Sequence, residues 1–365
     1  MRILYDHQIY VEQEYGGISR YFYELGKELK TDLHVDVENT TCLSNNVYTT
    51  DPIYSSKKFF PNNKFKGKVR LLKIINELNS KVKLKGSYDI FHPTYYDTYF
   101  LKEIKNRPFV ITFYDLIHEK FAHKFDDLTD DKQLFEKRKK LLDKASKIIA
   151  ISNSTKNDII EVYKVPETKI EVVYLASSIN PGKRDNEIPY DNYILYVGNR
   201  RYYKNFKLFI EAIAPLLIKE KGIKVICAGG PKFDLSEMNF FIELKIANQL
   251  LQLSINDHLL STLYKKALFF VFPSVYEGFG IPVLEAFSCS CATLLSATSS
   301  LPEVGGDAAL YFDPYDKDDI LDKVTLLLYD SDLRDKLKKN GVKRLKLFSW
   351  LQTAKDHYGI YKSVL

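Results

Sequence analysis

The segment EGFGIPVLEAF, residues 277–287, holds two carboxylates, a glycine turn and a proline. Pro282 suits the first turn of a helix, where free backbone N–H groups and the helix dipole favour an anion. Glycines on both sides of Phe279 let the backbone approach such an anion closely. A diphosphate fits there, but it does not explain the acids.

Glu277 and Glu285 would repel a phosphate, so we expect them to accept hydrogen bonds from hydroxyl groups. The spacing suits two sets of hydroxyls on either side of a diphosphate, which matches the parts of a nucleotide sugar. The alternative is an ordinary strand–turn–helix with a solvated Glu277 and a partly buried Glu285.

A basic cluster occupies YVGNRRYYKNF, residues 196–206. A strand is predicted to end at Gly198, which puts Arg200, Arg201 and Lys204 in the following loop and helix start. Such cations can hold a leaving diphosphate as negative charge develops on it. Ordinary surface charge is the alternative, and the acidic loop in the same half favours the binding role.

The N-terminal half carries weaker signals. EYGGISRYF, residues 14–22, lacks the G-x-G-x-x-G pattern, which argues against a nicotinamide enzyme, although Gly17 could let backbone approach a phosphate. Two predicted strand ends, residues 91–97 and 112–121, place titratable groups beside tyrosines that can contact a sugar ring. The candidates there are His92, Tyr95, Tyr114, Asp115 and His118. A structural role is the alternative for each histidine.

These candidate residues can lie close together only if the strands before them end at a common edge of a sheet. The pattern of apolar residues predicts such strands. Strand-length segments lie at 2–6, 88–92, 107–115, 147–153, 169–176, 193–199, 223–230, 267–274, 292–297 and 308–312. Helical segments alternate with them, including a weaker one at 236–254. The pattern predicts an α/β fold of two parallel, doubly wound sheets, with the main site in a cleft between the domains. The segment 177–192 is the predicted linker.

Composition narrows the class of protein. The chain has 365 residues, which suits two domains. No segment approaches the about 18 uncharged apolar residues of a membrane helix, and the N-terminus lacks the apolar core of a secretory signal. We therefore expect a cytoplasmic protein whose four cysteines are reduced.

One stretch is strongly basic. Residues 57–85 hold ten basic residues and one acid, Glu77. Four apolar residues there recur at helical spacing: Val69, Leu72, Ile75 and Leu78. A basic amphipathic helix can lie on an anionic membrane, and the alternative is a solvated helix packed on its own domain. No nucleic-acid motif accompanies the charge, so nucleic acid is not expected as a partner.

The segments VFPSVYEGFGIPVLEAF (271–287) and SSLPEVGGDAALYFDP (299–314) resemble the signature of family-4 glycosyltransferases, which have the GT-B fold. The resemblance continues through GGISRY, DIFHPTYY, TFYDLIHE, ISNSTKNDI, YVGNRRYYKNF and FSW, and looks most like the branch of mannosyltransferases that builds bacterial O-antigen polysaccharides. It implies an acceptor-side domain at 1–180, a nucleotide-sugar domain at 190–345 and a final helix, 346–365, that crosses back to the N-terminal domain.

The resemblance also implies a reaction. A hexose, from GDP-mannose by branch, would pass with retention to a lipid-linked or lipopolysaccharide glycan, without a metal or cofactor, at the inner face of the cytoplasmic membrane. Glu277 would contact the donor sugar and Glu285 the ribose, while Lys204 with Arg200 or Arg201 would neutralise the diphosphate. The remaining implied donor contacts are Gly17, Gly278, Phe279, Gly280, Ile281 and Val283.

The chain departs from the family at two positions and in one segment, QLLQLSINDHLL (249–260), which lacks the usual glycine near the base pocket, so the sequence does not distinguish guanine from uracil. Many members have histidine where this chain has Tyr114, which leaves Asp115 or His118 for part of that catalytic role. Asn199 stands where an arginine is usual. A UDP-sugar donor on the same fold is an alternative to GDP-mannose. Further alternatives are a nucleotide-sugar epimerase and an inactive nucleotide-sugar-binding scaffold.

Overall fold

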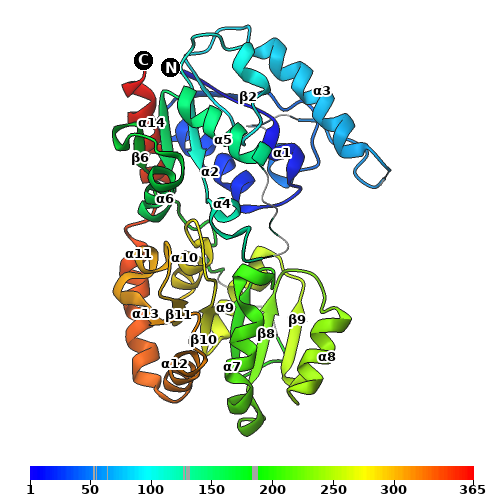
Figure 1. The fold of residues 1–365 in the computed structure, drawn as a ribbon, viewed down its shortest axis with the longest axis vertical. Helices are drawn as coiled ribbons and strands as arrows, with labels where there is room; N and C mark the ends of the chain where they lie inside the picture. The colour runs from blue at the N-terminus through cyan, green and yellow to red at the C-terminus, as the bar shows by residue number, and fades with distance from the viewer. Residues whose placement is uncertain (52–53, 55, 64, 126–127, 129–131, 183–187) are drawn as a thin grey trace. The chain divides into compact units, whose positions relative to one another are not determined.

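The computed structural model describes residues 1–51, 54, 56–63, 65–125, 128, 132–182 and 188–365 (Figure 1). The chain divides into two compact units. The first contains Met1–Glu119, Asp130–Leu175 and Trp350–Leu365, and the second contains Lys120–Thr129 and Ala176–Ser349. The predicted linker, 177–192, falls in the second unit, and its residues 183–187 lie outside the described ranges.

The first unit is built on two short parallel sheets, in the orders β2-β1-β3 and β4-β5-β6. A parallel bridge between Phe91 and Phe109 joins them. The strands are β1 (Arg2–Tyr5), β2 (Asp36–Asn39), β3 (Ile90–His92), β4 (Val110–Phe113), β5 (Lys147–Ala150) and β6 (Ile170–Val172). β3 and β4 are buried along their whole length, as expected for parallel strands covered on both faces.

Helices cover these strands. They are α1 (Gln8–Glu12), α2 (Gly17–Thr31), α3 (Lys68–Lys83), α4 (Ile117–Phe121), α5 (Lys132–Lys144), α6 (Asn153–Tyr163) and α14 (Trp350–Ser363). α6 begins after Ser152, whose hydroxyl accepts a hydrogen bond from the N–H of Thr155 at 3.0 Å. This cap satisfies one of the backbone donors that a helix start leaves unpaired.

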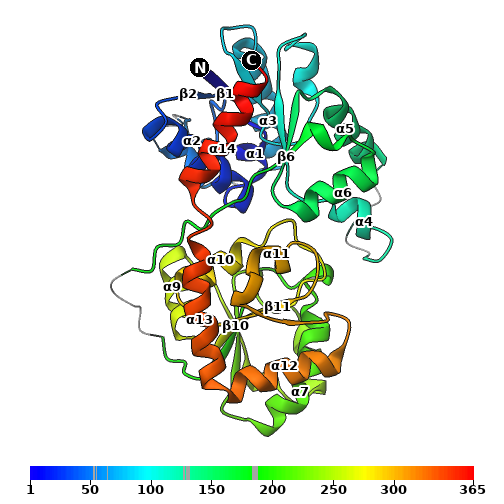
Figure 2. The ribbon, with the colours of Figure 1, turned by 90° about the vertical axis from the view of Figure 1, so that its left-hand side faces the viewer.

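The last helix, α14, packs in the first unit beside α2 (Figure 2). His357 joins the two helices, because its Nε2 lies 2.6 Å from the hydroxyl of Tyr21 and its Nδ1 lies 2.7 Å from the carbonyl of Thr353. Burial lowers the pKa of His357 to about 4. The imidazole is therefore neutral inside the core at neutral pH.

The second unit has one parallel sheet of six strands, in the order β12-β11-β10-β7-β8-β9. The strands are β7 (Tyr193–Val197), β8 (Lys224–Ala228), β9 (Leu250–Leu253), β10 (Phe269–Phe272), β11 (Thr293–Ser296) and β12 (Leu310–Phe312). Figure 2 shows α7 and α12 on one face of this sheet and α9, α10 and α13 on the other. The predicted doubly wound α/β architecture is confirmed.

The helices of the second unit are α7 (Phe206–Lys219), α8 (Leu235–Glu243), α9 (Asp257–Lys266), α10 (Ile281–Ser288), α11 (Leu301–Gly305), α12 (Lys317–Tyr329) and α13 (Ser331–Leu345). α7 is mostly apolar, and its Phe209 and Ile213 are completely buried in the core with β7 and β8. A helix with so wide an apolar face belongs against a sheet.

Two strands were not predicted. β9 lies inside 236–254, where we expected helix, so that prediction is wrong at its end: α8 stops at Glu243 and Lys245 takes a φ of 61°. The positive φ breaks the helix and starts a new direction. β2 has the sequence DVEN, in which only Val37 is apolar and buried, so it carries no strand signal of its own.

Candidate functional site

The second sheet reverses its winding between β7 and β10. From β7 the chain moves through β8 to β9 at one edge, and from β10 it moves through β11 to β12 at the other, while β7 and β10 are neighbours. The loops at the carboxyl ends of two such strands diverge, and ligands of doubly wound sheets bind there. One loop follows Val197 and the other follows Phe272.

These two loops bring Lys204 and Glu277 together. The Nζ atom of Lys204 lies 2.6 Å from Oε1 of Glu277, and the two side chains are only 15% and 13% exposed. Asn205, at a φ of 56°, turns the chain into α7 directly after Lys204, and its side-chain amide donates to the carbonyl of Pro314 at 2.7 Å. The ion pair is therefore held on a supported turn.

The loop after β10 is tightly buttressed. The N–H of Glu277 donates to Ser299 Oγ at 2.9 Å, and the hydroxyl of Ser300 donates to the carbonyls of Glu277 and Phe279 at 2.9 and 3.0 Å. Gly280 has a φ of 100°, and a Cβ there would lie 2.9 Å from a methyl of Leu301. Glycine is required at this position because the backbone is left-handed and space is lacking.

α10 begins at Ile281 with Pro282 in its first turn and no side-chain cap. The positive end of its dipole thus lies next to the Lys204–Glu277 pair, an environment that favours an anion. Gly278 and Ile281 are half-buried, whereas Phe279 and Val283 are buried. The N–H of Val283 bonds to the carbonyl of Gly280 at 2.9 Å, so Val283 stabilises the turn.

Glu285 lies one turn further along α10 and is 7% exposed. The hydroxyl of Tyr264, on α9, donates to its Oε2 at 3.3 Å. Burial and then the neighbouring Glu285 raise the pKa of Tyr264, so this tyrosine stays protonated as a donor. One carboxylate oxygen of Glu285 thus has a fixed partner inside the second unit.

The structure separates the two adjacent arginines. The guanidinium of Arg200 makes hydrogen bonds of 2.6 and 3.0 Å to the carboxylate of Glu237 on α8, and its side chain is 3% exposed. It also lies over the ring of Phe233. Arg201 is exposed. Arg200 is therefore engaged in structure, and Arg201 is the arginine accessible from solvent.

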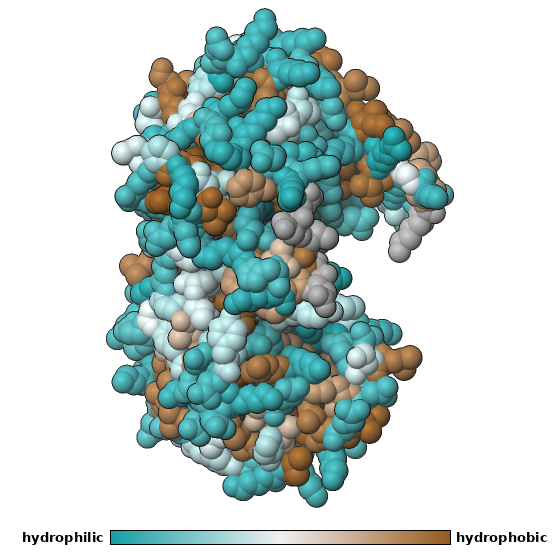
Figure 3. Space-filling view, viewed as in Figure 1, coloured by the Kyte–Doolittle hydropathy of each residue, from teal (hydrophilic) through white to brown (hydrophobic). Residues whose placement is uncertain are grey.

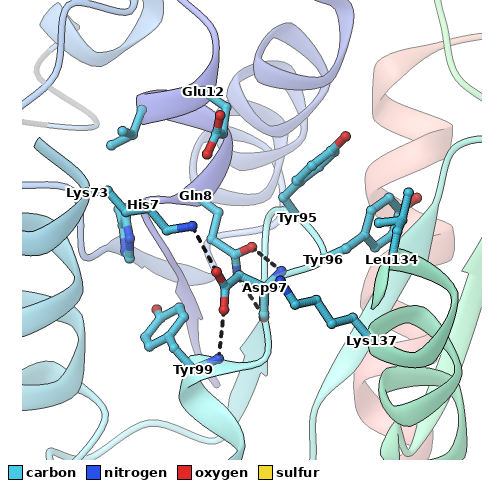
Figure 4. Close-up of a pocket in the computed structure, with 11 residues that line it drawn as sticks. His7, Gln8, Glu12, Lys73, Tyr95, Tyr96, Asp97, Tyr99, Leu134 and Lys137 are labelled. Atoms are coloured by element: carbon cyan, nitrogen blue, oxygen red, sulfur yellow. Dashed lines mark hydrogen bonds and ion pairs between the residues drawn. The ribbon is translucent and has the colours of Figure 1, made fainter. Parts of the chain in front are cut away.

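The first unit has a pocket at the equivalent edge, beyond β1 and β3 (Figure 4). Its volume is about 210 Å³, and it is lined by His7, Gln8, Val11, Glu12, Lys73, Tyr95, Tyr96, Asp97, Tyr99, Leu134 and Lys137. Asp6 is buried next to the lining residue Gln8. It accepts hydrogen bonds from the N–H of Thr94 at 2.8 Å and from the side-chain amide of Gln8 at 2.7 Å. The loops after β1 and β3 are thus tied together.

Charges of both signs line this pocket. Lys73 Nζ lies 2.9 Å from Oδ2 of Asp97. Burial alone would raise the pKa of Asp97, but its hydrogen bond with Lys73 and that cation's charge outweigh burial, so the pKa lies below its ordinary value. His7 is completely buried, which lowers its pKa, and among the described residues its Nε2 has no hydrogen-bond partner.

Two of the residues predicted for the first unit lie in the core. His92 is completely buried, and its ring nitrogens lie 2.7 Å from the Tyr361 hydroxyl and 3.0 Å from that of Thr112. Burial lowers its pKa well below the ordinary value. Tyr114 is also buried, with its hydroxyl 3.3 Å from the carbonyl of Thr94. These contacts correct the expectation of a sugar contact for both, because their polar atoms are turned into the protein.

The other predicted residues of this unit lie nearer the surface. Tyr95 lines the pocket. Asp115 is half-buried and accepts from the N–H of Ile117 at 3.2 Å. His118 Nδ1 is buried without a hydrogen-bond partner in the ranges that the structure describes. Gly17 is exposed at the start of α2, and a Cβ there would meet no atom within 4 Å.

Several pocket residues were not predicted. His7 and Gln8 directly follow the first predicted strand, and Asp97 is the last residue of the predicted strand end 91–97, after β3. The rule that ligands bind beyond strand carboxyl ends would have found them. Lys73 and Lys137 come from helices far along the chain, and their sequence neighbourhoods show only surface charge.

Comparisons with known proteins agree with this architecture. Residues 15–176 match the family described as Glycosyltransferase Family 4, and residues 182–344 match the family described as Glycosyl transferases group 1. O-antigen chain mannosyltransferase B of Escherichia coli is 30% identical over 234 residues, which are 60% of this chain and 61% of that protein. An uncharacterized glycosyltransferase of Methanocaldococcus jannaschii is 26% identical over 78% of each chain.

A solved structure shares the fold over the whole chain. Sucrose-phosphate synthase from Thermosynechococcus elongatus superposes with a TM-score of 0.80 at 19% identity, covering 100% of this chain and 99% of that one. The match to the Escherichia coli mannosyltransferase spans about three fifths of that protein's length.

Proposed function

The chain belongs to the glycosyltransferases, with a family 4 domain followed by a group 1 domain on the GT-B fold, and on this premise we propose that it is a retaining hexosyltransferase. The donor we propose is GDP-mannose, since the Escherichia coli relative is an O-antigen chain mannosyltransferase. The acceptor would be a glycan carried on a polyprenyl diphosphate or a lipopolysaccharide intermediate of a bacterial surface polysaccharide.

The Lys204–Glu277 pair carries this proposal. It places an ammonium group and a carboxylate 2.6 Å apart, beside the N-terminus of α10 and at the reversal point of the sheet. A bound diphosphate would compete with Glu277 for the ammonium group of Lys204. The hydroxyls of the donor sugar would then donate hydrogen bonds to the carboxylate of Glu277. The same ion pair thus provides a cation for the diphosphate and a carboxylate for the sugar hydroxyls of a nucleotide sugar.

The transfer step follows from these roles. The bond between the anomeric carbon and the leaving phosphate oxygen breaks, and the acceptor oxygen bonds to that carbon on the same face. The proton of the acceptor hydroxyl passes to the leaving phosphate oxygen, so no protein nucleophile is required. Lys204 and Arg201 stabilise the developing charge, and Glu285 binds the ribose. These cations make a metal unnecessary in this proposal.

We assign the acceptor to the first unit. The pocket beyond β1 and β3 is lined by the hydroxyl-bearing Tyr95 and by charges of both signs, among them Glu12 and Lys137. Such a lining suits a hydroxyl-rich glycan better than an apolar molecule. Asp115 and His118 remain the candidate catalytic groups of this unit, and Gly17 the candidate for close approach to the diphosphate.

Turnover with a panel of nucleotide sugars tests the reaction. We expect nucleotide release from GDP-mannose that depends on an added membrane lipid extract. Nucleotide release from a UDP-sugar but not from GDP-mannose would show that the donor is a UDP-sugar. Conversion of the sugar without acceptor would indicate an epimerase, and binding without turnover of any donor would indicate a scaffold.

A thermal shift identifies the base independently of turnover. A ligand at one hundred times its Kd stabilises a protein by about 2.7 kcal/mol. GDP should therefore raise the Tm more than UDP at equal concentration. A larger shift with UDP would contradict the proposed donor.

A further inference from the structure

α3 turns an apolar side outward. Leu71, Ile74, Leu78 and Val82 are 42%, 48%, 61% and 68% exposed, and we call these four residues the α3 face. Their spacing of three or four residues aligns them in one stripe along the helix. The sequence-based choice of Val69, Leu72, Ile75 and Leu78 was wrong: Leu72 is buried while Val69 is 55% exposed. A constant spacing of three residues drifts around a helix and forms no single face.

Buried polar groups fix this orientation. Asn76 and Ser80 are completely buried on the other side of α3. The side chain of Asn76 accepts from the N–H of Cys42 at 2.8 Å and donates to the carbonyl of Leu43 at 2.8 Å, while Ser80 Oγ lies 2.7 Å from His7 Nδ1. Turning the α3 face inward would break these hydrogen bonds, at a cost for each buried group left unpaired. The stripe is therefore held outward.

Phenylalanines extend the apolar surface beyond the start of α3. Phe60 and Phe65 are 57% and 44% exposed, and their ring centroids lie 6.1 Å apart. Phe59 joins them, with its ring 4.9 Å from that of Phe60. Aromatic side chains are favoured where apolar lipid meets water.

The surroundings of this surface are basic. Residues 57–85 hold ten basic residues, and the single acid, Glu77, is paired with Lys81 at 2.7 Å. Figure 3 shows hydrophobic atoms beside hydrophilic ones over α3, at the upper right edge. Lysine is depleted in protein–protein interfaces, whereas a lysine rim around an apolar stripe complements anionic lipid headgroups. The charge pattern thus favours lipid as the partner.

We infer that the α3 face and the exposed Phe60 and Phe65 form the surface by which this chain lies on a bilayer containing anionic lipid. In the part of the chain that the structure describes, no helix is long and apolar enough to cross a bilayer. Lys73, which also lies on α3, is one of the residues that line the pocket of the first unit, where it pairs with Asp97. Docking α3 therefore sets one wall of the proposed acceptor pocket near the headgroups, so the inference extends the proposed lipid-linked acceptor.

Vesicle sedimentation of the full chain tests the surface. Vesicles of phosphatidylcholine mixed with phosphatidylglycerol should bind the chain, and phosphatidylcholine alone should bind it weakly. We expect the combined change Leu71→Gln, Ile74→Gln and Leu78→Gln to lower binding at least roughly tenfold. Replacing Arg70, Lys66 and Lys85 with glutamine should weaken binding on the order of a hundredfold and reduce its dependence on salt.

Matched controls separate this surface from general stickiness. Leu235 and Ile242 on α8 are 84% and 59% exposed, and changing both to glutamine should leave vesicle binding unchanged. The native Trp350 is buried, so its emission serves as a background, measured on the unsubstituted chain, that is subtracted from the emission of Phe65→Trp. The emission of Phe65→Trp should shift to the blue with anionic vesicles, whereas that of Leu235→Trp should not.

Three outcomes would overturn the inference: equal binding by the α3 variant, no blue shift at position 65, or a concentration-dependent dimer that the α3 variant abolishes without any vesicle binding. The last would assign the surface to a second copy of the chain. Vesicle binding requires no donor, and transfer can be measured with a detergent-solubilised acceptor. Loss of one with retention of the other therefore distinguishes a failed docking surface from a failed proposed function.

Discussion

Lys204 and Glu277 pair at 2.6 Å although 73 residues separate them in the sequence. The contact exists because β7 and β10 are neighbours at the reversal of the sheet, and each residue follows one of these strands. The two side chains are mostly buried, so water screens their attraction less than it would at the surface.

Glu277→Gln should lower transfer by roughly two orders of magnitude or more, the scale for removing a transition-state contact. Glutamine retains the shape of the side chain but loses the charge that pairs with Lys204. Initial rates and a thermal melt measure activity and fold in parallel. Glu243→Gln, at an exposed position on α8, is the matched control and should retain full activity. Equal activity of the two variants would remove Glu277 from the site.

Lys204→Met should weaken donor use by roughly tenfold to a hundredfold, because a hydrogen bond to a charged group is worth about 1.5–3 kcal/mol. Arg200→Met should instead lower the free energy of unfolding by about 2 kcal/mol, since it leaves Glu237 without its guanidinium partner. Donor titrations and urea unfolding separate the two effects. A pure loss of donor affinity in Arg200→Met would show that this arginine leaves Glu237 to bind the diphosphate.

Gly17→Ala should reduce transfer without reducing stability. The added methyl group meets no atom within 4 Å and sits at the start of α2, where alanine favours the helix by up to about 1 kcal/mol. Activity would fall only if a ligand must approach this backbone. Gly280→Ala is the contrasting variant: it strains a backbone at a φ of 100° and should lower the free energy of unfolding by about 1–3 kcal/mol. Full activity in Gly17→Ala would refute the proposed approach.

Unfolding should become easier below about pH 6.5, because His357 is held neutral in the folded chain. Its pKa falls from the ordinary 6.5 to about 4 by burial, so the unfolded chain takes up the proton first. The free energy of unfolding therefore decreases as the pH drops from 6.5 to about 4, by roughly 3 kcal/mol for this residue. Burial lowers the pKa of His92 in the same direction.

Urea unfolding at several pH values measures this dependence. His357→Gln retains a partner for the Tyr21 hydroxyl but cannot titrate, so its profile should be flatter by about one proton. An unchanged slope in His357→Gln would show that other groups dominate the acid sensitivity.

The sequence was most informative where local pattern and topology coincide. Buried parallel strands form continuous apolar runs, so their ends, and the loops carrying Glu277 and Lys204, could be predicted. β2 could not, because the sequence DVEN gains its strand conformation only by pairing with β1. Intrinsic propensity is too weak to show such a strand.

The direction of a side chain was less accessible than its position. Arg200 and Arg201 are neighbours, yet only Arg200 turns to Glu237, a partner 37 residues away. His92 ends a strand as a ligand-binding histidine would, but its Nδ1 meets Tyr361 across a separation of 269 residues. Such long-range partners leave no local signal, and they decide whether a strand-end residue faces the core or the solvent.

The assignment of α14 to the first unit makes the stretch Ala176–Ser349 an insertion in the sequence of that unit. A chimaera that exchanges this stretch with a relative needs two junctions, one before Ala176 and one after Ser349. A single cut near residue 176 would separate Tyr361 and His357 from His92 and Tyr21, leaving buried polar atoms unpaired in the truncated fragment. The segment that follows Ser349 must therefore travel with the N-terminus in any modular redesign.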